Sequence, residues 1–427
     1  MQGHRLLFEE NEETFLRAPM FTTFVAPSNK NWSLRNRRFY MSKTTRQLAN
    51  IISVTLGMRL FSMLIIIPFL SVYALNLEGG APWLTGYALG IFGLTQAVLQ
   101  IPFGMLSDRI GYKKMMLAGL IMLIVGLLTA AYATSIYWLI FARALQGSGA
   151  IVTVGYSWIS SAAGDEERDK QLTRLGAVLG TFTMLSYLIG PLVHIVLSVS
   201  HMFVFSAVLI AICFVWVLLF TKQVDPEVRK LKSAEKAKQK SVFNRRNLMM
   251  GLMLTTNNLM SMAFFFMLPM LLTGVLETNR MWMILTPAIL CSVLLLPVFS
   301  RLSQKGKGKI TIGSLFIVEG LGFGLMYIGN IAGIVAGTIL LTTGTFAIST
   351  IVPMLANRGI DNQQRGKGNG IIVSLQYVGS FLGAALTGTL WNFSPDFAFV
   401  FTGLVALGGM TLVATFPKNK QAEAATA

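Results

Sequence analysis

The sequence predicts an all-α integral membrane protein with twelve transmembrane helices arranged as two six-helix bundles. The first observation is composition: of 427 residues, 54% are hydrophobic and 12% are charged, too apolar a balance for a soluble protein of this size. The second is a series of twelve apolar segments, each able to cross a hydrocarbon core of about 30 Å. The third is an internal repeat relating the two halves of the chain.

The twelve segments begin at residue 48 and end at residue 416, and none has the alternating pattern of a membrane β-barrel. They span residues 48–74, 83–107, 113–132, 136–162, 171–198, 201–221, 246–273, 281–302, 309–328, 332–357, 366–390 and 396–416. We therefore expect an N-terminal bundle over 48–221, a Lys-rich cytoplasmic linker over 222–245, a C-terminal bundle over 246–416 and a cytoplasmic tail over 417–427.

Residues 1–47 are polar and basic and lack the apolar core of a cleavable signal peptide. We expect a mostly disordered cytoplasmic extension, and Met41 is a second possible start. The alternative is a basic arm on the membrane surface that uses Trp32, Arg35, Arg37, Arg38 and Phe39.

The basic residues set the predicted topology. The net charge is +17, but these residues are spread over loops between apolar segments, which argues against a nucleic-acid-binding patch. With both termini cytoplasmic, 32 of the 35 Lys and Arg residues are cytoplasmic, Arg59 and Arg143 lie within helices and Arg280 is external. Cys213 and Cys291 fall inside apolar segments and predict neither a disulfide nor a metal site.

A short polar stretch, Gly104–Lys114, joins the second and third segments. Gly104 allows helices to approach closely, and Gly111 permits a turn at the membrane surface. Asp108 can face the positive N-terminus of a neighbouring helix, while Arg109 and Lys113 meet anionic headgroups. The Ile101–Lys114 stretch aligns with Leu296–Lys309 at a constant offset of 195 residues, with Ser303 in place of Asp108.

This stretch resembles the signature loop of the major facilitator superfamily. The matching residues are Gly104, Leu106, Asp108, Arg109, Gly111 and Lys113. The resemblance implies a gating motif in which Asp108 latches one conformation against a second-half helix near Gly366. Tyr112 stands where the family usually carries Arg, so Lys113 or Arg109 would have to replace that Arg in a charge relay.

The fourth segment contains Phe141–Ala150, which resembles the superfamily motif R-x-x-q-G-x-g. By this resemblance Arg143 takes part in proton transfer; the alternative is that it pins helices by bonding carbonyls near Gly147 and Gly149. In the fifth segment, Gly180, Ser186, Gly190 and Pro191 loosely match an antiporter motif, and Gly190-Pro191 suits a hinge. His194 follows, either as a titrating group or as a simply hydrogen-bonded one.

Two further charged residues lie deep in apolar segments. Arg59 is near mid-depth on the first helix and, with Arg143, would make the cavity cationic, which favours an anionic group on the substrate or a partner from the other half. Glu319 is the only deep carboxylate, so it is a candidate proton carrier or a structural hydrogen-bonding group. Other expected polar cavity residues are Gln96, Gln100, Gln146, Tyr156, Tyr187, Asn257, Asn258 and Gln376.

These features predict a secondary transporter similar to drug/proton antiporters, which exports amphipathic small molecules by alternating access. The alternatives are an organic-anion or metabolite exchanger using Arg59 and Arg143, a copper transporter using Met249 and Met253, and a channel or receptor. The sequence shows no catalytic nucleophile, P-loop or hydrolase constellation, so it predicts neither an enzyme nor a cofactor. We expect a monomer in the cell membrane that handles a small molecule and protons.

Overall fold

The computed structural model describes residues 34–163, 165–222, 245–273, 275–277, 280–358 and 365–416. Within these ranges the chain is helical, with a single isolated bridge between Glu78 and Ser135. The predictions for residues 1–33, for most of the linker (223–244) and for the tail (417–427) lie outside the described residues.

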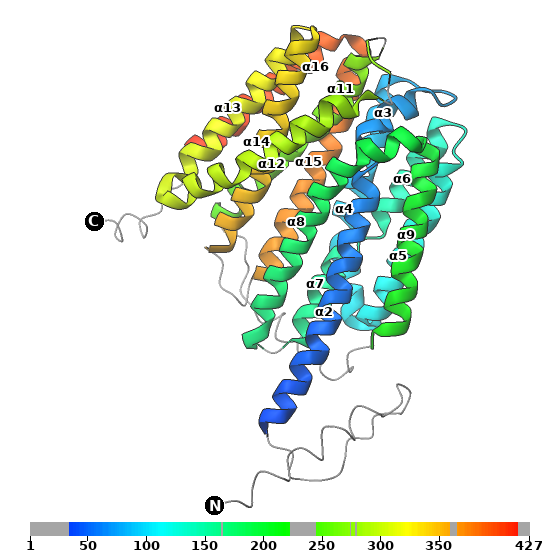
Figure 1. Cartoon of the computed structure of the whole chain (residues 1–427), viewed down its shortest axis with the longest axis vertical. Coiled ribbons are helices and arrows are strands. Elements are labelled where there is room, and N and C mark those ends of the chain that lie inside the picture. The colour runs from blue at the N-terminus through cyan, green and yellow to red at the C-terminus, as the bar shows by residue number, and fades with distance from the viewer. Residues whose placement is uncertain are drawn as a thin grey trace, which may run out of the picture. The chain divides into compact units, whose positions relative to one another are not determined.

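The helices follow the predicted segments closely (Figure 1). In chain order they are α2 (Leu34–Leu64), α3 (Ile67–Leu75), α4 (Pro82–Ile110), α5 (Tyr112–Ala131), α6 (Ile136–Ser148), α7 (Val152–Ala162), α8 (Asp165–Val196), α9 (Val199–Phe220), α11 (Arg245–Leu272), α12 (Trp282–Leu302), η2 (Ser303–Lys307), α13 (Gly308–Tyr327), α14 (Ile331–Arg358), α15 (Arg365–Phe393) and α16 (Pro395–Ala414).

In the described residues, eleven helical segments are long and apolar enough to cross a membrane, and one of them contains two crossings. That segment, Trp282–Tyr327, is 46 residues long and includes both α12 and α13. The helix is interrupted between them because Gly306 has φ +81° and Lys305 has ψ 24°. The expected twelve membrane helices are therefore confirmed.

Two of the predicted spans are broken helices. The first span changes from α2 to α3 at residues 65–66, just before Pro68, whose ring nitrogen cannot donate to the preceding turn. The fourth span breaks between α6 and α7 at Gly149, where a Cβ would lie 2.5 Å from the carbonyl oxygen of Gly119. Both breaks lie next to the buried polar groups described below.

The helix α2 begins at Leu34, 14 residues before the predicted start at residue 48. The disordered extension expected over 1–47 is therefore wrong for residues 34–47, which are helical. No Gly or Pro occurs between Leu34 and Leu56, so nothing in the sequence ends the helix before the apolar segment.

The helices carry exposed apolar faces that suit a lipid environment. On α9, the side chains of Ile212, Val215 and Leu219 are exposed at helical spacing, and α16 repeats this pattern with Val400 and Leu404. Such stripes on single helices would be costly in water, whereas lipid covers them without cost.

The two ends of the helices differ in composition. We call the end with the Gly111 turn the motif end, and the other end the opposite end. The motif end has the basic groups Arg109, Lys114, Arg301, Lys305, Lys307 and Lys309. The opposite end has the exposed aromatic residues Trp83, Tyr132, Tyr137, Trp138, Tyr327, Phe393 and Phe397. Aromatic rings of this kind gather at membrane interfaces.

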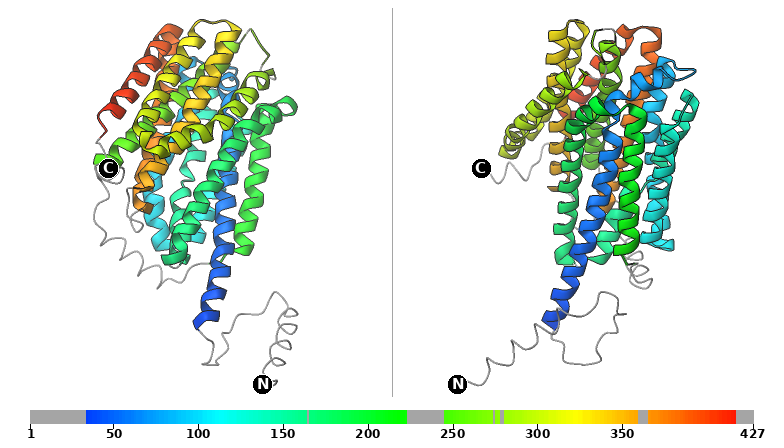
Figure 2. Two further views of the ribbon diagram at one scale, coloured as in Figure 1. Left: turned by 60° about the vertical axis from the view of Figure 1, so that its left-hand side comes forward. Right: turned by 45° about the vertical axis from the view of Figure 1, so that its right-hand side comes forward.

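Helices α2–α9 form one group and α11–α16 form another, shown from blue to green and from yellow-green to red in Figures 1 and 2. The groups meet along α4 and α15, where small residues bring the backbones together. A Cβ on Gly90 would lie 2.9 Å from the carbonyl oxygen of Phe381, and one on Gly93 would lie 2.6 Å from that of Tyr377. A Cβ on Gly86 would clash with the carbonyl oxygen of Ala384.

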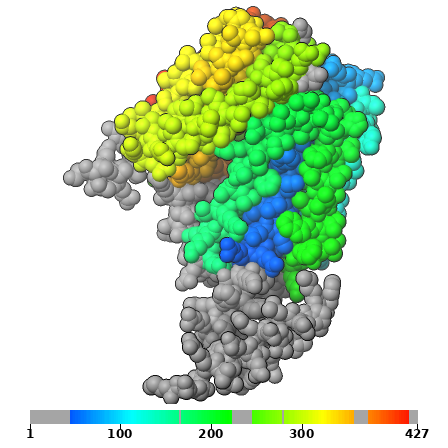
Figure 3. All heavy atoms as spheres, viewed as in Figure 1, coloured from blue at the N-terminus to red at the C-terminus, as the bar shows by residue number. Residues whose placement is uncertain are grey.

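The other face of α15 packs as closely on α11. Side chains added at Gly379 and Gly383 would clash with the carbonyl oxygens of Thr255 and Leu259. The helix α15 is therefore held between α4 of the first group and α11 of its own group, with glycines at both contacts. In the first group, α2 lies between α8 and α9 on the face shown in Figure 3.

Candidate transport site

The Gly104–Lys114 stretch forms the turn between α4 and α5. Helix α4 ends at Ile110, Gly111 adopts φ +117°, and α5 begins directly at Tyr112. A positive φ is costly for any residue with a side chain, which accounts for the glycine. The predicted turn and the role of Gly111 in it agree with this geometry.

Tyr112 supplies the polar link that the sequence analysis sought from Lys113 or Arg109. Its hydroxyl donates a hydrogen bond of 2.7 Å to Asp108 Oδ1 and shares another, of 2.9 Å, with Ser161 Oγ on α7. The Tyr112 side chain is only 1% exposed. The residue that departs from the family pattern therefore ties Asp108 to the end of the fourth span.

Lys113 contacts a neighbouring helix of its own group. Its ammonium donates to the carbonyl oxygens of Leu218 at 2.7 Å and Thr221 at 2.6 Å, at the C-terminal end of α9. Those carbonyls lack helical partners and form the negative end of the helix dipole, so a cation there is stabilising.

The second copy of the turn repeats this contact. Lys309 donates to the carbonyl oxygens of Ala414 at 2.7 Å and Phe416 at 3.1 Å, at the end of α16. The equivalent of Lys113 is thus Lys309, one position from the constant offset. The reason is that α13 begins two residues after its positive-φ glycine, whereas α5 begins one residue after Gly111.

Arg59 lies on α2 and is completely buried. Its Nη2 donates to Gln96 Oε1 on α4, and Gln96 Nε2 donates in turn to Gln100 Oε1 at 3.1 Å. The phenol of Tyr377 on α15 lies close to the Arg59 guanidinium. A side chain from the second group therefore reaches the buried cation of the first.

Arg143 lies on α6 and is 1% exposed. Its Nη1 donates to Gln146 Oε1 at 2.8 Å, and its Nε donates to the carbonyl oxygen of Ala88 on α4 at 3.3 Å. The guanidinium stands over the ring of Phe92, 5.2 Å from its centre. Arg143 does pin α6 to α4, but through Ala88 and not through carbonyls near Gly147 or Gly149.

The two arginines leave donors without acceptors. In the described part of the chain, Arg59 Nε and Nη1, Arg143 Nη2 and Gln100 Nε2 are buried with no hydrogen-bond partner. Neither arginine forms an ion pair with a described carboxylate. Because a buried cation without a counter-charge is costly, this cluster is suited to an acceptor-rich or anionic group.

Aromatic rings join the two helix groups near these cations. Tyr187 on α8 stacks on Phe265 of α11, with ring centres 5.0 Å apart and planes at 7°, and lies 5.6 Å from Phe346 of α14. Phe92 and Tyr377 meet edge to face at 5.7 Å. Stacked and edge-to-face rings of this kind stabilise the contact between the two groups.

Glu319 lies on α13 and is completely buried within the second group. The hydroxyl of Thr345 on α14 donates to its Oε1 at 3.1 Å, while Oε2 has no partner among the described residues. A side chain at Gly344 would overlap the Glu319 side chain, so α14 passes very close to it. Glu319 is therefore not brought to Arg59 or Arg143.

Other predicted site residues lie apart from the arginine cluster. The His194 ring stacks on Phe69 at 4.1 Å, and its Nδ1 is 3.1 Å from the carbonyl oxygen of Leu197. This is the hydrogen-bonded alternative of the sequence analysis. Gly190 packs on the carbonyl oxygen of Ile65 at the break in the first span, where an added Cβ would lie 2.8 Å away.

The predicted polar cavity residues on α11 and α15 differ in the contacts that they make. Asn257 donates to Ser349 Oγ at 2.9 Å, whereas the amide of Asn258 donates back to the carbonyl oxygen of Leu254. Gln376 makes no side-chain hydrogen bond in the described part, and its neighbour Tyr377 is the residue beside Arg59.

Sequence reasoning missed Phe92, Phe265, Thr345, Phe346 and Tyr377, and it named Tyr112 only as a departure from the family pattern. Tyr377 was missed because the polar amide of Gln376 drew attention one position away, which is about 100° around a helix. The methionines Met249 and Met253 are buried in the core. No group of three His, Cys, Asp or Glu residues in the described ranges could hold a metal ion.

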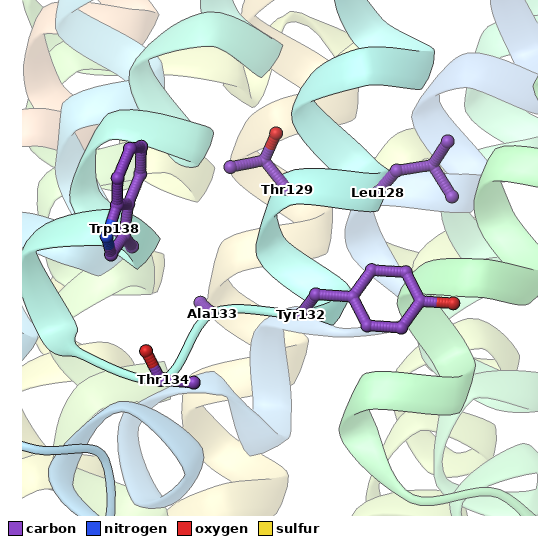
Figure 4. A pocket seen from close by; sticks show the side chains of 6 residues that line it. All are labelled: Leu128, Thr129, Tyr132, Ala133, Thr134 and Trp138. Atoms are coloured by element: carbon purple, nitrogen blue, oxygen red, sulfur yellow. The ribbon is translucent and has the colours of Figure 1, made fainter.

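A surface pocket of about 390 Å³ lies at the turn between α5 and α6 (Figure 4). Its lining is Leu128, Thr129, Tyr132, Ala133, Thr134 and Trp138. Tyr132 and Trp138 point to different sides of the turn and are largely exposed. The pocket belongs to the aromatic rim of the opposite end and contains no charged residue.

Twelve membrane helices in two groups, with buried cations and rings where the groups meet, define a multi-pass membrane transporter. The sequence profile of the Major Facilitator Superfamily matches residues 52–384. The chain therefore belongs to this superfamily, whose members are transporters and not enzymes. The family resemblance of the Gly104–Lys114 stretch and the predicted fold are confirmed.

Known relatives match parts of the chain. It is 38% identical over 153 residues to the inner membrane transport protein YajR of Escherichia coli, covering 36% of this chain and 34% of YajR. It is 32% identical over 169 residues to the multi-drug resistance efflux pump PmrA of Streptococcus pneumoniae, covering 36% and 41%. The chain spans about a third to about half of the length of the curated relatives that match first.

Among solved structures, the human organic anion transporter MFSD10 (TETRAN) superposes with a TM-score of 0.65. The superposition covers 86% of this chain and 99% of that protein at 14% sequence identity. At this identity the likeness describes the fold alone.

Proposed function

We propose that the protein is a proton-coupled exporter of amphipathic small molecules that works by alternating access in the cytoplasmic membrane. The observation that carries this proposal is the aromatic cluster formed by Tyr187, Phe265 and Phe346, which joins the two helix groups. Stacked rings bind flat, greasy molecules with little demand on their polar groups. The named activity of PmrA as a multi-drug efflux pump points the same way.

The contact between α4 and α15 supports a closed state at the opposite end. Backbone contacts at Gly86, Gly90 and Gly93 extend along the half of α4 that begins at Pro82. In the proposed cycle these contacts separate as the motif end closes, and the Asp108 turn then contacts the second group. The predicted placement of both termini in the cytoplasm makes the motif end the inner side.

Internal pH in proteoliposomes tests the proposal. Ethidium, a flat aromatic cation, is added to vesicles that contain the purified protein and a trapped pH indicator. Proton movement triggered by ethidium, and lost in Arg143→Ala, is the expected result. Ethidium uptake without any proton movement would contradict proton coupling.

Organic-anion exchange is a second candidate, favoured by the unpaired donors of Arg59 and Arg143. Their guanidiniums are buried with three nitrogens lacking hydrogen-bond partners in the described part of the chain, and a carboxylate would satisfy them. Fluorescein, an aromatic anion, distinguishes this candidate in the same vesicles. Fluorescein exchange that moves no protons and is lost in Arg59→Ala would replace the first proposal with the second.

A further inference from the structure

The proposed function needs a group that can bind and release a proton inside the membrane. Guanidinium groups keep their proton in proteins, so Arg59 and Arg143 can attract or repel a charge but cannot carry the proton themselves. His194 is held at the end of α8 by Phe69 and the carbonyl of Leu197, away from the contact between the two groups.

Of the eighteen acidic residues in the sequence, Glu319 is the one that lies deep within an apolar span, far from either end of it. It is also completely buried, and the only group that bonds it in the described part is the Thr345 hydroxyl. An ionised carboxylate in such a place would lack both a cation and further donors. A protonated carboxyl fits, because its hydroxyl needs fewer partners.

The described side chains of the helices packed against α13 provide no counter-charge for Glu319. Their charged and titratable side chains that the structure describes are Arg245 and Arg246 on α11, Cys291 and Arg301 on α12, Lys305 and Lys307 in η2, Lys309 and Tyr327 on α13, and Asp396 on α16. Within the described part of the chain, none of them is within hydrogen-bonding or ion-pairing reach of Glu319.

Thr345 links Glu319 to α11, which packs on α15, through two different groups. Thr345 donates to Glu319 through its hydroxyl, and its carbonyl oxygen accepts from Asn257 Nδ2 at 3.5 Å. Asn257 also donates to Ser349, one helical turn further along α14. Thr345 and Ser349 are half-buried, whereas Glu319 and Asn257 are fully buried. The two hydroxyls are therefore on the less buried side of this group of residues.

We propose that Glu319 is the proton-carrying residue of the transport cycle, and that its proton enters and leaves on the face of α14 that carries the Thr345 and Ser349 hydroxyls, with Asn257 positioning that face. This inference rests on the proposed proton coupling and places the proton in the second helix group, apart from the arginines of the first. Thr345 is a positioning residue: its hydroxyl holds the carboxyl toward the half-buried face of α14.

A carbodiimide test addresses the proton site without any transport. Dicyclohexylcarbodiimide partitions into membranes and adds to protonated carboxyls in apolar surroundings. In the full-length protein in proteoliposomes, mass spectrometry should find the label on Glu319 at neutral pH, and less of it as the pH rises. Asp396, an exposed carboxylate at the start of α16, is the matched control and should stay unlabelled. An unlabelled Glu319 at neutral pH would overturn the inference.

A transport test addresses the role of that proton. Glu319→Gln keeps the shape and the contact with Thr345 but cannot titrate. We expect this variant to lose ethidium accumulation driven by a pH gradient and to lose the pH dependence of ethidium exchange across the vesicle membrane. Thr345→Val should shift the pH dependence of accumulation, and Thr345→Ser should restore it. Equal accumulation by wild type and Glu319→Gln would overturn the inference.

The two tests separate this inference from the proposed function. If wild-type protein moves no ethidium, the proposed function fails, and the label on Glu319 still decides whether the residue carries a proton. If wild-type protein couples ethidium to protons and Glu319→Gln does so equally, the function stands and the proton site lies elsewhere.

Discussion

The two helix groups share a frame but differ in their buried chemistry. Each has a proline inside the helix before its repeated turn, a positive-φ glycine in the turn, and a lysine that caps the last helix of the group. The first group encloses two arginines and ties Asp108 to Tyr112. The second has Ser303 in place of Asp108 and encloses a single carboxyl, Glu319.

This difference indicates which features the fold requires and which the transport chemistry requires. The turn glycines and capping lysines occur in both groups because each group must end its helices at a membrane surface. The buried charged or titratable residues differ between the groups, and because such residues are costly within a membrane they are the first candidates for a functional role. The asymmetric residues are therefore the ones to test for transport.

The largest expected effect comes from the buried cation of the first group. Arg143→Leu leaves the carbonyl of Gln146 without its donor, and an unsatisfied buried group costs about 1–3 kcal/mol. We expect ethidium-driven proton movement to fall by roughly tenfold to a hundredfold, at 1.4 kcal/mol per tenfold. Arg143→Lys keeps the charge but loses the paired donors of the guanidinium. Its ethidium-driven proton movement should lie between that of the wild type and that of Arg143→Leu. Wild-type activity in Arg143→Leu would mean that the arginine has no part in transport.

The contact between the groups should respond to a larger side chain. Gly86→Val places atoms against the carbonyl oxygen of Ala384, an overpacking that costs about 1–3 kcal/mol. We expect the opposite end to open. Spin labels can be placed at Tyr137 and Phe397, which are both exposed at the opposite end. Pulsed electron paramagnetic resonance should then report a longer distance between the labels than in the unsubstituted protein. Gly180→Val is the control, because nothing lies within 4 Å of a Cβ at Gly180. In this variant the distance between the two spin labels should stay unchanged.

The link from Asp108 to α7 exists in the first group only. Tyr112→Phe removes the hydroxyl that bonds Asp108 and Ser161, and we expect a loss of about 0.5–1.5 kcal/mol in thermal stability. Ser161→Ala should add little once the hydroxyl is gone, so the pair should be non-additive in a double-mutant cycle. Fully additive losses would show that the two hydroxyls do not act together.

The smallest effect should be shared by both groups. Lys113→Met and Lys309→Met each remove a cation from a helix C-terminus, worth about 0.3–1 kcal/mol. Thermal unfolding in detergent should therefore show similar small decreases in both variants. Lys114→Met, which changes an exposed neighbour, should leave the unfolding temperature unchanged. A decrease in only one of the capping variants would contradict the claim that Lys113 and Lys309 stabilise their groups in the same way.

The sequence predicted the membrane helices well because hydropathy over a long window reports each crossing directly. It also predicted the turn at Gly111, since a glycine after an apolar helix has few other roles. It did not predict the breaks at residues 65–66 and at Gly149, because they depend on which neighbouring backbone comes close. Tyr377 and Thr345 were missed for a related reason: a helix face is chosen by packing partners that the sequence does not reveal.

The most direct test of the account is the pH dependence of ethidium binding to the purified protein. The account holds that substrate and proton bind to different groups and influence each other. Coupling of this kind is reciprocal: if a bound proton weakens ethidium binding, bound ethidium must weaken proton binding by the same factor. Wild-type protein should bind ethidium more weakly as the pH falls, and Glu319→Gln should bind it equally at every pH. Unchanged pH dependence in Glu319→Gln would contradict the account.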